Sequence, residues 1–346
     1  MKQLLPQRWR QTALLPLAGL LVLLATGVTR GQTGPVIGLG DVPHGVADIE
    51  KAIAFYQNAL GLELLSVAPD RVGSKLGPNF YDAKLQALMN VGGAHYRIAT
   101  FKIANAGFRL QLVEMINNDP LSALRGRRQS SALPTEGGVL MLRLPVGDLD
   151  ATSTKIHDQF LADVLTVGGR PAGGPTRKLS IRDGEDGFLI ELVEPPAGSP
   201  GIVLTAADAD KKLLFFRDIL GFTLRTGEWE QDAAAMAAVG VAGGRVRRHA
   251  GVVPGTGVPF EIDEYQGFHQ RRFYSPIMGQ TGVGWIQLVV RDIDDLMTTL
   301  VAKRIRIVST GLEPVTFDDS RRVVIRDPDG VFIELIQRGA PVEKGR

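Results

Sequence analysis

The stretch that decides the fold is Ile181-Arg182-Asp183-Gly184-Glu185-Asp186-Gly187-Phe188-Leu189-Ile190-Glu191-Leu192. It returns later in the chain as Ile325-Arg326-Asp327-Pro328-Asp329-Gly330-Val331-Phe332-Ile333-Glu334-Leu335. Each copy predicts a strand, an acidic turn containing glycine, and a second strand, because Asp and Gly suit tight turns and the flanking residues favour strands. An internal repeat of this kind predicts a repeated structural unit.

A second repeated stretch predicts the helix of the unit. Residues 46–62 match residues 206–222, and each stretch has an Asp, at Asp48 and Asp208, before an apolar pattern with helical spacing. The Asp suits the N-cap of a helix, and Gly61 and Gly221 follow at the position of a left-handed C-cap. The chain is therefore predicted to contain four modules, each a strand, a helix and further strands, in the order 1-2-1′-2′.

The length and a proline-rich stretch predict how the modules are grouped. A chain of 346 residues is long enough for two domains. Residues 194–201 (Glu-Pro-Pro-Ala-Gly-Ser-Pro-Gly) form the clearest linker. We predict domain 1 at 36–197, with modules 1 and 2, and domain 2 at 198–340, with modules 3 and 4.

The N-terminal residues resemble a signal peptide. Lys2, Arg8 and Arg10 precede an apolar run, and small residues follow it, so cleavage near Gly31 is expected, giving a periplasmic or secreted protein. The alternative is an uncleaved membrane anchor, although the run is shorter than the roughly 20 apolar residues that cross a bilayer. After cleavage we expect no stable membrane association.

Composition excludes some classes of function. The chain has no Cys, which excludes disulfides and thiolate chemistry. Removing residues 1–31 takes away four basic residues and no acid, so the formal net charge changes from +2 to −2. This balance gives no reason to expect a nucleic-acid partner. Two loops carry basic residues that are read as solvated charges or as contacts to a substrate anion: Arg125, Arg127, Arg128, Arg271 and Arg272.

Together these repeats resemble the vicinal oxygen chelate superfamily, which includes glyoxalase I, the bleomycin-resistance proteins, methylmalonyl-CoA epimerase and extradiol dioxygenases. The resemblance rests on the Asp48…Phe55-Tyr56…Gly61 run and the Arg326-Asp327-Pro328-Asp329-Gly330…Glu334 run. It implies an α+β fold in which four βαβββ modules pair into two cup-shaped domains, module 1 with 2 and module 3 with 4. It also implies a small-molecule substrate or ligand. It does not name that molecule, because one fold of this kind hosts several activities.

The resemblance further implies which residues face each cup. The last-strand position falls on Gln111, Glu191, Glu261 and Glu334 in the four modules. The first-strand position, seven residues before the helix-capping Asp, falls on Asp41, Met141, Gly201 and Trp285, and none of these is His. A divalent metal ion in domain 1 would therefore have Asp41, Gln111 and Glu191 as ligands, with His44 added if the strand bulges. Domain 2 offers only Glu261 and Glu334, with Trp285 closing one side.

Alternative structural roles for these carboxylates remain open. Glu191 and Glu334 could pair with an Arg that lines the cup, and Arg97 and Arg247 are candidates because they lie at matching places in modules 1 and 3. The repeated pairs Arg177-Lys178 and Arg321-Arg322 are interpreted as charges at strand edges.

Two classes of function follow. The first is a metal-dependent lyase, isomerase or dioxygenase acting on a small oxygenated substrate, in which Glu191 ligates the ion or moves a proton. The second is a metal-free protein that binds or sequesters a small molecule, as the bleomycin-resistance proteins do. Domain 1 is expected to be the active one, because its cup positions keep more polar groups.

Overall fold

The computed structural model describes residues 34–70, 77–117, 131–160, 162–174, 176–184, 186–195, 198–268 and 274–339. The predicted signal segment 1–31 and the basic residues Arg125, Arg127, Arg128, Arg271 and Arg272 lie outside these ranges. Within the described ranges, no helix combines the length and the apolar character that crossing a bilayer requires.

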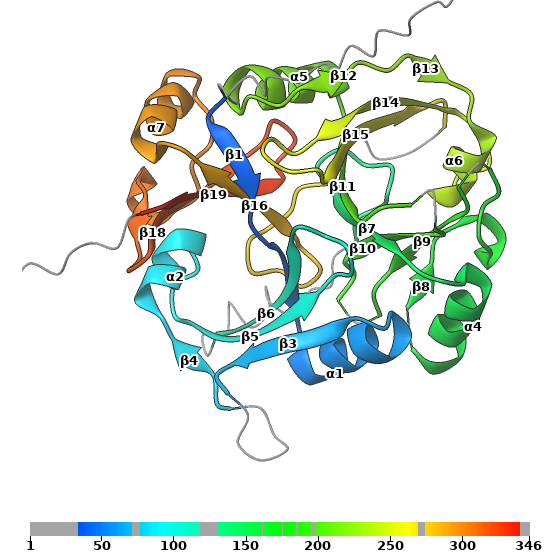
Figure 1. Ribbon diagram of the computed structural model, residues 1–346, viewed down its shortest axis with the longest axis horizontal. Coiled ribbons are helices and arrows are strands. Elements are labelled where there is room, and N and C mark those ends of the chain that lie inside the picture. Colours follow the sequence, from blue (N-terminus) through cyan, green and yellow to red (C-terminus); the bar gives the residue numbers. More distant parts are fainter. Residues whose placement is uncertain are drawn as a thin grey trace, which may run out of the picture. The chain divides into compact units, whose positions relative to one another are not determined.

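The four modules are present, each with a strand, a helix and further strands (Figure 1). Module 1 contains β1 (Val36–Leu39), β2 (Val42–Val46), α1 (Ile49–Ala54), the π-helical turn η1 (Phe55–Ala59), β3 (Glu63–Ala68), β4 (Phe80–Tyr81), α2 (Ala83–Met89), β5 (Ala94–Lys102) and β6 (Arg109–Asn117). Module 2 contains β7 (Leu140–Pro145), α4 (Leu149–Gln159), β8 (Asp163–Val164), η2 (Val167–Gly169), β9 (Lys178–Arg182) and β10 (Leu189–Val193).

The second half of the chain repeats this order. Module 3 contains β11 (Gly201–Ala206), α5 (Ala209–Leu214), η3 (Phe215–Ile219), β12 (Leu224–Arg225), β13 (Trp229–Glu230), α6 (Ala233–Ala238), β14 (Arg245–Val252) and β15 (Pro259–Gln266). Module 4 contains β16 (Trp285–Val290), α7 (Ile293–Ala302), η4 (Thr310–Leu312), β17 (Val315–Thr316), β18 (Ser320–Arg326) and β19 (Phe332–Arg338). The predicted α+β architecture is confirmed.

The helix boundaries follow the predicted capping residues. The carboxylate of Asp48 accepts hydrogen bonds from the amides of Glu50 and Lys51, and Asp208 accepts one from Lys211. Gly61 and Gly221 have φ of 70° and 77°, the left-handed region that suits glycine after a helix.

The modules pair differently from the prediction. β7 of module 2 pairs antiparallel with β11 of module 3, which joins these modules in one sheet with the order β12-β14-β15-β11-β7-β10-β9-β8. β1 of module 1 pairs antiparallel with β16 of module 4 (Figure 1). The prediction that modules 1 and 2, or 3 and 4, share a cup is therefore wrong. We call the two units the 2–3 cup and the 1–4 cup.

The length of the connections gives a physical reason for this pairing. β10 ends at Val193 and β11 begins at Gly201, so the proline-rich linker spans only the short distance around β7, which lies between these two strands. Residues 194–201 therefore join the two halves of one cup and do not separate two domains. Modules 1 and 2 are joined by a much longer segment, between Asn117 and Leu140.

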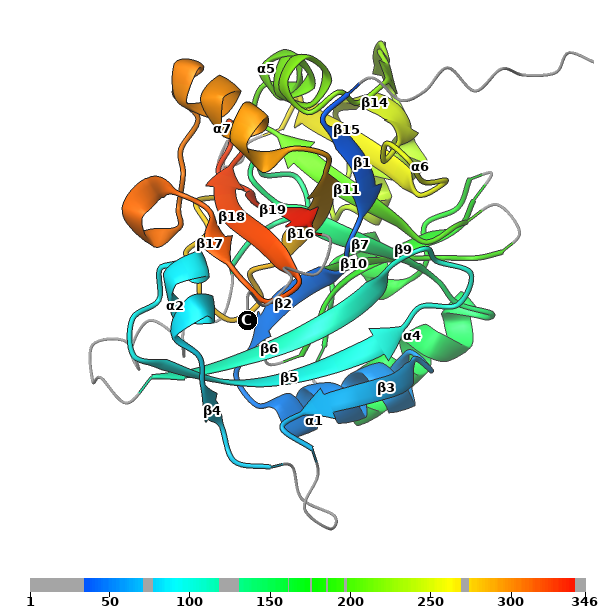
Figure 2. The same ribbon diagram turned by 60° about the vertical axis from the view of Figure 1, so that its left-hand side comes forward.

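The helices cover the outer faces of the strands, while the inner faces line the cups. Helix α1 packs against β5 and β6, and α5 packs against β11 and β15 (Figure 2). The outward side chains of both cups, such as Leu142, Ile202 and Leu288, are buried in one shared core. This packing fixes which side chains face inward, because alternate residues of a strand point to opposite faces.

Candidate functional site

A row of four polar side chains crosses the floor of the 1–4 cup. The amide Nε2 of Gln111 donates to Asp41 Oδ2 at 2.7 Å, and the backbone N–H of Asp41 donates to Gln287 Oε1 at 3.0 Å. Gln287 Nε2 in turn donates to Glu334 Oε2 at 2.9 Å. Strands from modules 1 and 4 thus bring Asp41, Gln111, Gln287 and Glu334 together. We call these four residues the polar row.

Arginines flank both ends of the polar row. Arg109 binds Asp41 with two hydrogen bonds of 2.9 Å, from Nε to Oδ1 and from Nη2 to Oδ2. At the other end, Arg322 Nη1 lies 3.5 Å from Glu334 Oε1. The first pair is a bidentate ion pair of good geometry, whereas the second is long and therefore weak.

Of the two carboxylates in the polar row, Glu334 has the weaker ion pair, because Arg322 is farther from it than Arg109 is from Asp41. Its side chain is 1% exposed and accepts a hydrogen bond from Trp285 Nε1 at 3.1 Å. Burial raises the pKa of Glu334 above its usual range, although Arg322, Gln287 and Trp285 oppose the shift. A buried carboxyl group whose pKa is raised can hold a proton closer to neutral pH than an ordinary glutamate does.

A cavity of about 360 Å³ lies over the polar row. This volume is in the range of small-molecule sites. Its apolar wall consists of side chains from α2, β5, β6, β16 and β19: Leu85, Leu88, Met89, Tyr96, Ile98, Val113, Trp285 and Ile336. Helix α2 also contacts the opposite module, since Ser309 Oγ donates to the carbonyl of Leu88 at 2.8 Å. The cavity therefore combines a charged floor with an apolar wall.

The 2–3 cup has a different interior at the equivalent positions. Arg143 on β7 donates from Nη1 and Nη2 to the two carboxylate oxygens of Glu261, each at 2.7 Å, and from Nε to Glu191. Lys178 Nζ donates to Glu191 Oε1 at 2.8 Å. A guanidinium group thus lies between the two carboxylates that the resemblance places at metal-ligand positions.

These cations keep Glu191 ionised. Burial alone would raise the pKa of Glu191, but the charges of Arg143 and Lys178 hold it at about 2. Arg143 likewise outweighs burial and lowers the pKa of Glu261. Both carboxylates are therefore committed to internal ion pairs at neutral pH. A catalytic role of Glu191 stays a prediction.

The predicted metal site of Asp41, Gln111, Glu191 and His44 is not assembled. Asp41 and Gln111 lie in the 1–4 cup, whereas Glu191 lies in the 2–3 cup. The second predicted group, Glu261, Trp285 and Glu334, is divided in the same way, because Trp285 and Glu334 belong to the 1–4 cup. The physical reason is the pairing of the modules, which places the two halves of each predicted set on different sheets.

His44 faces away from Asp41. It is fully buried, stacks on Phe188 with ring centroids 4.3 Å apart, and lies with Nε2 2.8 Å from the hydroxyl of Tyr56. His44 lies three positions after Asp41, an odd spacing that directs their side chains to opposite faces of an extended chain. The suggestion that a bulge brings His44 into the cup is wrong.

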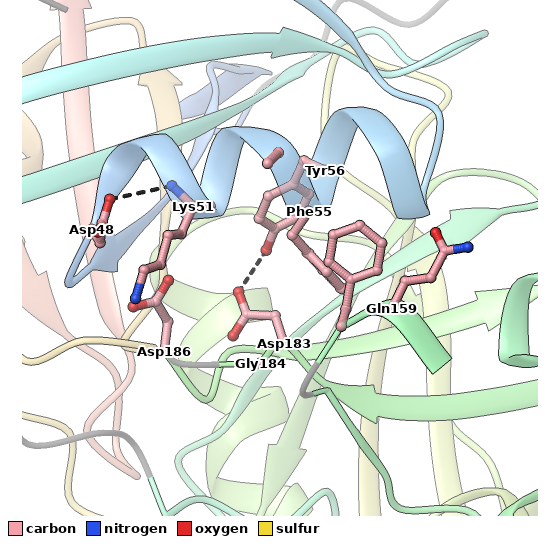
Figure 3. A pocket seen from close by; sticks show the side chains of 11 residues that line it. Asp48, Lys51, Phe55, Tyr56, Gln159, Asp183, Gly184 and Asp186 are labelled. Atoms are coloured by element: carbon pink, nitrogen blue, oxygen red, sulfur yellow. Dashed lines mark hydrogen bonds between the residues drawn. The ribbon is translucent and has the colours of Figure 1, made fainter. Parts of the chain in front are cut away.

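Tyr56 links His44 to the acidic turn of module 2. Its hydroxyl donates to Asp183 Oδ2 at 2.8 Å, and Figure 3 shows Tyr56 pointing from η1, the continuation of α1, toward Asp183. A hollow of about 260 Å³ beside this contact is lined by Phe55, Phe160 and the acidic turn. Asp183 also accepts from the amide of Phe188 at 2.6 Å, and Asp186 accepts from the amide of Ala47 at 2.7 Å. The carboxylates here are engaged in joining modules 1 and 2, so this hollow is the weaker candidate for a ligand site.

The arginines proposed as partners of Glu191 and Glu334 pair elsewhere. Arg97 binds Glu114, and Arg247 Nη2 donates to Glu264 at 2.7 Å. The actual partners include Lys178 and Arg322, which were interpreted as strand-edge charges but point into the cups. The expectation that Glu191 and Glu334 pair with a cation inside the cup is therefore correct, although the partners differ from those named.

Sequence reasoning missed Gln287, Arg143 and Arg109. Gln287 and Arg143 both lie five residues before a helix-capping Asp, at Asp292 and Asp148, and face the last-strand Glu of the same module across the sheet. The sequence did contain the information. Residues five and seven positions before the capping Asp lie on the same face of a strand, so both should face the cup. Arg109 lies two residues before Gln111 and could have been found by the same parity.

The donors of the polar row do not fit an ion that prefers imidazole. The groups that could bind a metal are two carboxylates and two amides. Each amide donates an N–H to one of the two carboxylates. Asp41 is further bound by both arms of Arg109. Over the described part of the chain, no cluster of three or more His, Cys, Asp or Glu side chains is placed to hold a metal.

Comparison with known proteins identifies the family of the chain and relatives of its fold. The sequence model of the Glyoxalase/Bleomycin resistance protein/Dioxygenase superfamily matches residues 41–192 and 200–335. No curated protein matches the chain by sequence. Glyoxalase I from Zea mays is similar in structure, with a TM-score of 0.53 and 14% identity over 88% of this chain and 92% of that one. A putative dioxygenase from Bacillus subtilis gives a TM-score of 0.51 and 13% identity over 89% and 87%. At these identities the likeness concerns the fold.

Proposed function

The chain belongs to the Glyoxalase/Bleomycin resistance protein/Dioxygenase superfamily, and we propose that its 1–4 cup binds a small oxygenated organic molecule without a resident metal ion. The observation that supports this proposal is the cavity of about 360 Å³ in which the polar row meets an apolar wall containing Trp285. In the 2–3 cup, Arg143 occupies the position equivalent to Gln287 and neutralises both carboxylates.

The charges of the floor indicate the chemistry of the ligand. Asp41 and Glu334 accept hydrogen bonds, whereas Arg109 and Arg322 donate them, so a ligand with neighbouring hydroxyl or carbonyl oxygens can satisfy both kinds of group. Its carbon skeleton would lie against the apolar wall. Catechol, an aromatic ring with two adjacent hydroxyls, has this combination and is a suitable probe.

The proposal is tested by the fluorescence of Trp285. In a background with Trp9→Phe and Trp229→Phe, catechol should quench the Trp285 emission, and Glu334→Gln should weaken the binding about tenfold because a charged hydrogen-bond acceptor is lost. Glu261→Gln, at the last-strand position of module 3 in the 2–3 cup, is the control and should leave the affinity unchanged. Equal weakening by both substitutions, or no quenching by catechol or related diols, would defeat the proposal.

One observation favours a second candidate, an enzyme in which Glu334 transfers a proton to or from the bound molecule. The buried Glu334 carboxyl lines the cavity and its pKa is raised, which is typical of a general acid or base. Turnover of a bound ligand that Glu334→Gln abolishes without loss of binding would support the enzyme. Binding that requires an added divalent ion would instead support metal-dependent chemistry.

Export is a separate proposal. It is supported by the positively charged start, the apolar run and the small residues that precede Gln32. N-terminal sequencing of the protein recovered from outside the cytoplasm should give a start near Gln32, and an intact Met1 on a cytoplasmic protein would contradict it.

A further inference from the structure

A second hollow, of about 630 Å³, lies at the other end of the 1–4 cup. Along β18, Arg322 lines the first cavity and Arg326 lines this second one, while Val324 between them is buried in an apolar cluster with Trp285 and Phe332. Along β18 the two hollows are separated by packed side chains, and Met89 lines both of them. The second contains none of the residues of the polar row.

Two arginines lie opposite each other on the wall of this hollow. The backbone N–H of Arg326 donates to the carbonyl of Arg306 at 2.9 Å, and the neighbouring residues Ile307 and Ile325 form an antiparallel bridge. Like charges at directly opposite positions of paired strands repel each other. The backbone thus fixes two positive charges side by side.

The guanidinium of Arg326 is held in a defined orientation. It lies 4.2 Å from the centroid of the Phe332 ring, and its Nη2 donates to the carbonyl of Pro276 at 2.9 Å. Its Nε is buried and has no hydrogen-bond partner. An unsatisfied buried donor is costly, so the hydrogen bonds of this guanidinium within the protein are incomplete.

No carboxylate forms an ion pair with these charges among the described residues, although the charge of Asp327 partly offsets that of Arg326. The described residues that line the hollow include no Asp or Glu, and neither arginine forms an ion pair with a described residue. Asp327, next to Arg326 in the sequence, is instead paired with the buried Lys212 at 2.9 Å. Burial, together with the charge of Arg306, lowers the pKa of Arg326.

The rest of the wall is mixed, with the polar residues Asn90, Ser309 and Thr310 beside a group of apolar side chains. Met115, Met278, Ile277 and Leu312 line it together with Phe332. A molecule that satisfies both parts of the wall needs an anionic group for the arginines and an apolar body for these side chains. The volume lies within the range of known small-molecule sites.

We propose that this hollow is a binding site for a small amphipathic organic anion, whose carboxylate or phosphate group is bound by Arg306 and Arg326 and whose apolar body rests on Met115, Met278 and Phe332. Arginine suits this role because its planar N–H groups match the oxygens of such anions. This site is distinct from the cavity over the polar row.

The experiment uses titration calorimetry on the chain from Gln32 with three probes. Hexanoate carries the charge and the apolar body, hexanol lacks the charge, and inorganic phosphate lacks the body. Hexanoate should bind most tightly, and Arg306→Gln or Arg326→Gln should each weaken it about tenfold or more, since a charge-assisted hydrogen bond is lost. Equal affinity for hexanol would overturn the anion site, and equal affinity for phosphate would overturn the amphipathic class.

Controls separate this site from other effects. Arg225→Gln removes one positive charge on β12, in the 2–3 cup, and should not change hexanoate affinity. Glu334→Gln should not change it either, whereas a change there would place hexanoate in the first cavity and overturn the proposal. Because Arg326 also contacts Pro276 and Phe332, its substitution can lower stability, and Arg306 provides the cleaner variant.

The charge reversal Arg306→Glu gives a second, independent readout. A glutamate there supplies Arg326 with the missing counterion, so the thermal unfolding midpoint should rise while hexanoate binding is lost. If the arginines served only to stabilise the strands, the midpoint would fall for Arg306→Gln and Arg306→Glu alike, and that result would overturn the proposal.

Discussion

The hydroxyl oxygen of Tyr56 lies 2.8 Å from Oδ2 of Asp183, and the same oxygen lies 2.8 Å from Nε2 of His44. Burial raises the pKa of Asp183 to about 7 and lowers the pKa of His44 to about 3. When Asp183 is ionised, the Tyr56 hydroxyl donates to its Oδ2. Protonation of Asp183 reverses this bond: Asp183 then donates to Tyr56, Tyr56 donates to Nε2 of a neutral His44, and His44 Nδ1–H donates to the carbonyl of Gly45 at 3.2 Å. Each of these groups then has a hydrogen-bond partner, so the arrangement favours a proton on Asp183.

Asp183→Asn should make stability at neutral pH higher than in the wild type. Because the folded pKa of Asp183, about 7, is above the unfolded value of 3.8, its proton-linked stability is present below pH 4 and is lost as pH rises to 7. The gain of the variant should therefore grow from pH 4 to 7, by up to about 1.4 kcal/mol per pH unit, and then level off. Urea unfolding at several pH values measures it. Asp318→Asn, at an exposed carboxylate, should show no such trend.

Once Asp183 is replaced, the protonation of His44 should determine how stability changes as the pH falls below neutral. Its folded pKa of about 3 is below the usual 6.5, so its contribution to stability is present above pH 6.5 and is lost as pH falls toward 3. In the wild type this slope opposes that of Asp183 between pH 4 and 6.5. The Asp183→Asn variant should therefore lose stability on acidification over that window more steeply than the wild type. Parallel curves for both proteins would contradict the shared-proton account.

Arg143→Met should be strongly destabilising. It would leave the carboxylates of Glu191 and Glu261 buried without their main cation, and removing one partner of a buried ion pair costs about 3–5 kcal/mol. Arg177→Met is the matched control, because its partners Asp150 and Glu194 are more exposed than Glu191 and Glu261, and such surface pairs contribute about 1 kcal/mol or less. Urea unfolding of both variants at pH 7 measures the difference. A loss near that of the control would show that Arg143 is not the central cation of the 2–3 cup.

Glu334→Gln and Glu191→Gln should act in opposite directions at pH 8. The pKa of Glu334 is raised by burial, so its ionised form costs stability as pH rises, and a neutral amide removes that cost. The pKa of Glu191 is lowered to about 2, mainly by Arg143 acting against burial, so its charge contributes stability above pH 4.5 that the amide would lose. The unfolding midpoint should rise for the first and fall for the second. Equal shifts of the unfolding midpoint in the two variants would contradict the opposite pKa shifts of Glu334 and Glu191.

Splitting the chain between modules 2 and 3 tests the pairing of modules. Residues 32–197 or 198–346 alone should not give a folded cup, because β7 needs β11 and β1 needs β16. The two pieces expressed together should associate and recover the near-ultraviolet dichroism of the intact chain, as size-exclusion chromatography can confirm. A half that unfolds cooperatively by itself would restore the predicted pairing of modules 1 and 2.

The sequence predicted the modules well because their signals are local. The acidic turns that begin at Asp183 and Asp327 and the caps at Asp48 and Asp208 depend on a few neighbouring residues, and they lie where the repeats indicated. The cup-facing set was found in part, since Asp41, Gln111, Trp285 and Glu334 do share one cavity.

The pairing could not be read from the repeats, because a tandem repeat does not say which strand edges meet. The proline-rich linker was interpreted as a boundary, yet its shortness is what keeps β10 and β11 on either side of β7. The partners of the carboxylates were missed for the same reason. Arg143 and Glu261 are 118 residues apart in the sequence, and only the sheet brings them together.

The antiparallel contacts of β7 with β11 and of β1 with β16 also set an order of events during synthesis of the chain. When modules 1 and 2 have left the ribosome, both first strands still have an open edge, and an open edge can pair with any other chain. β7 is covered as soon as Gly201–Ala206 has emerged, but β1 must wait for Trp285–Val290, which follows the whole of module 3. The edge of β1 therefore stays open to pairing with other chains while module 3 is being made.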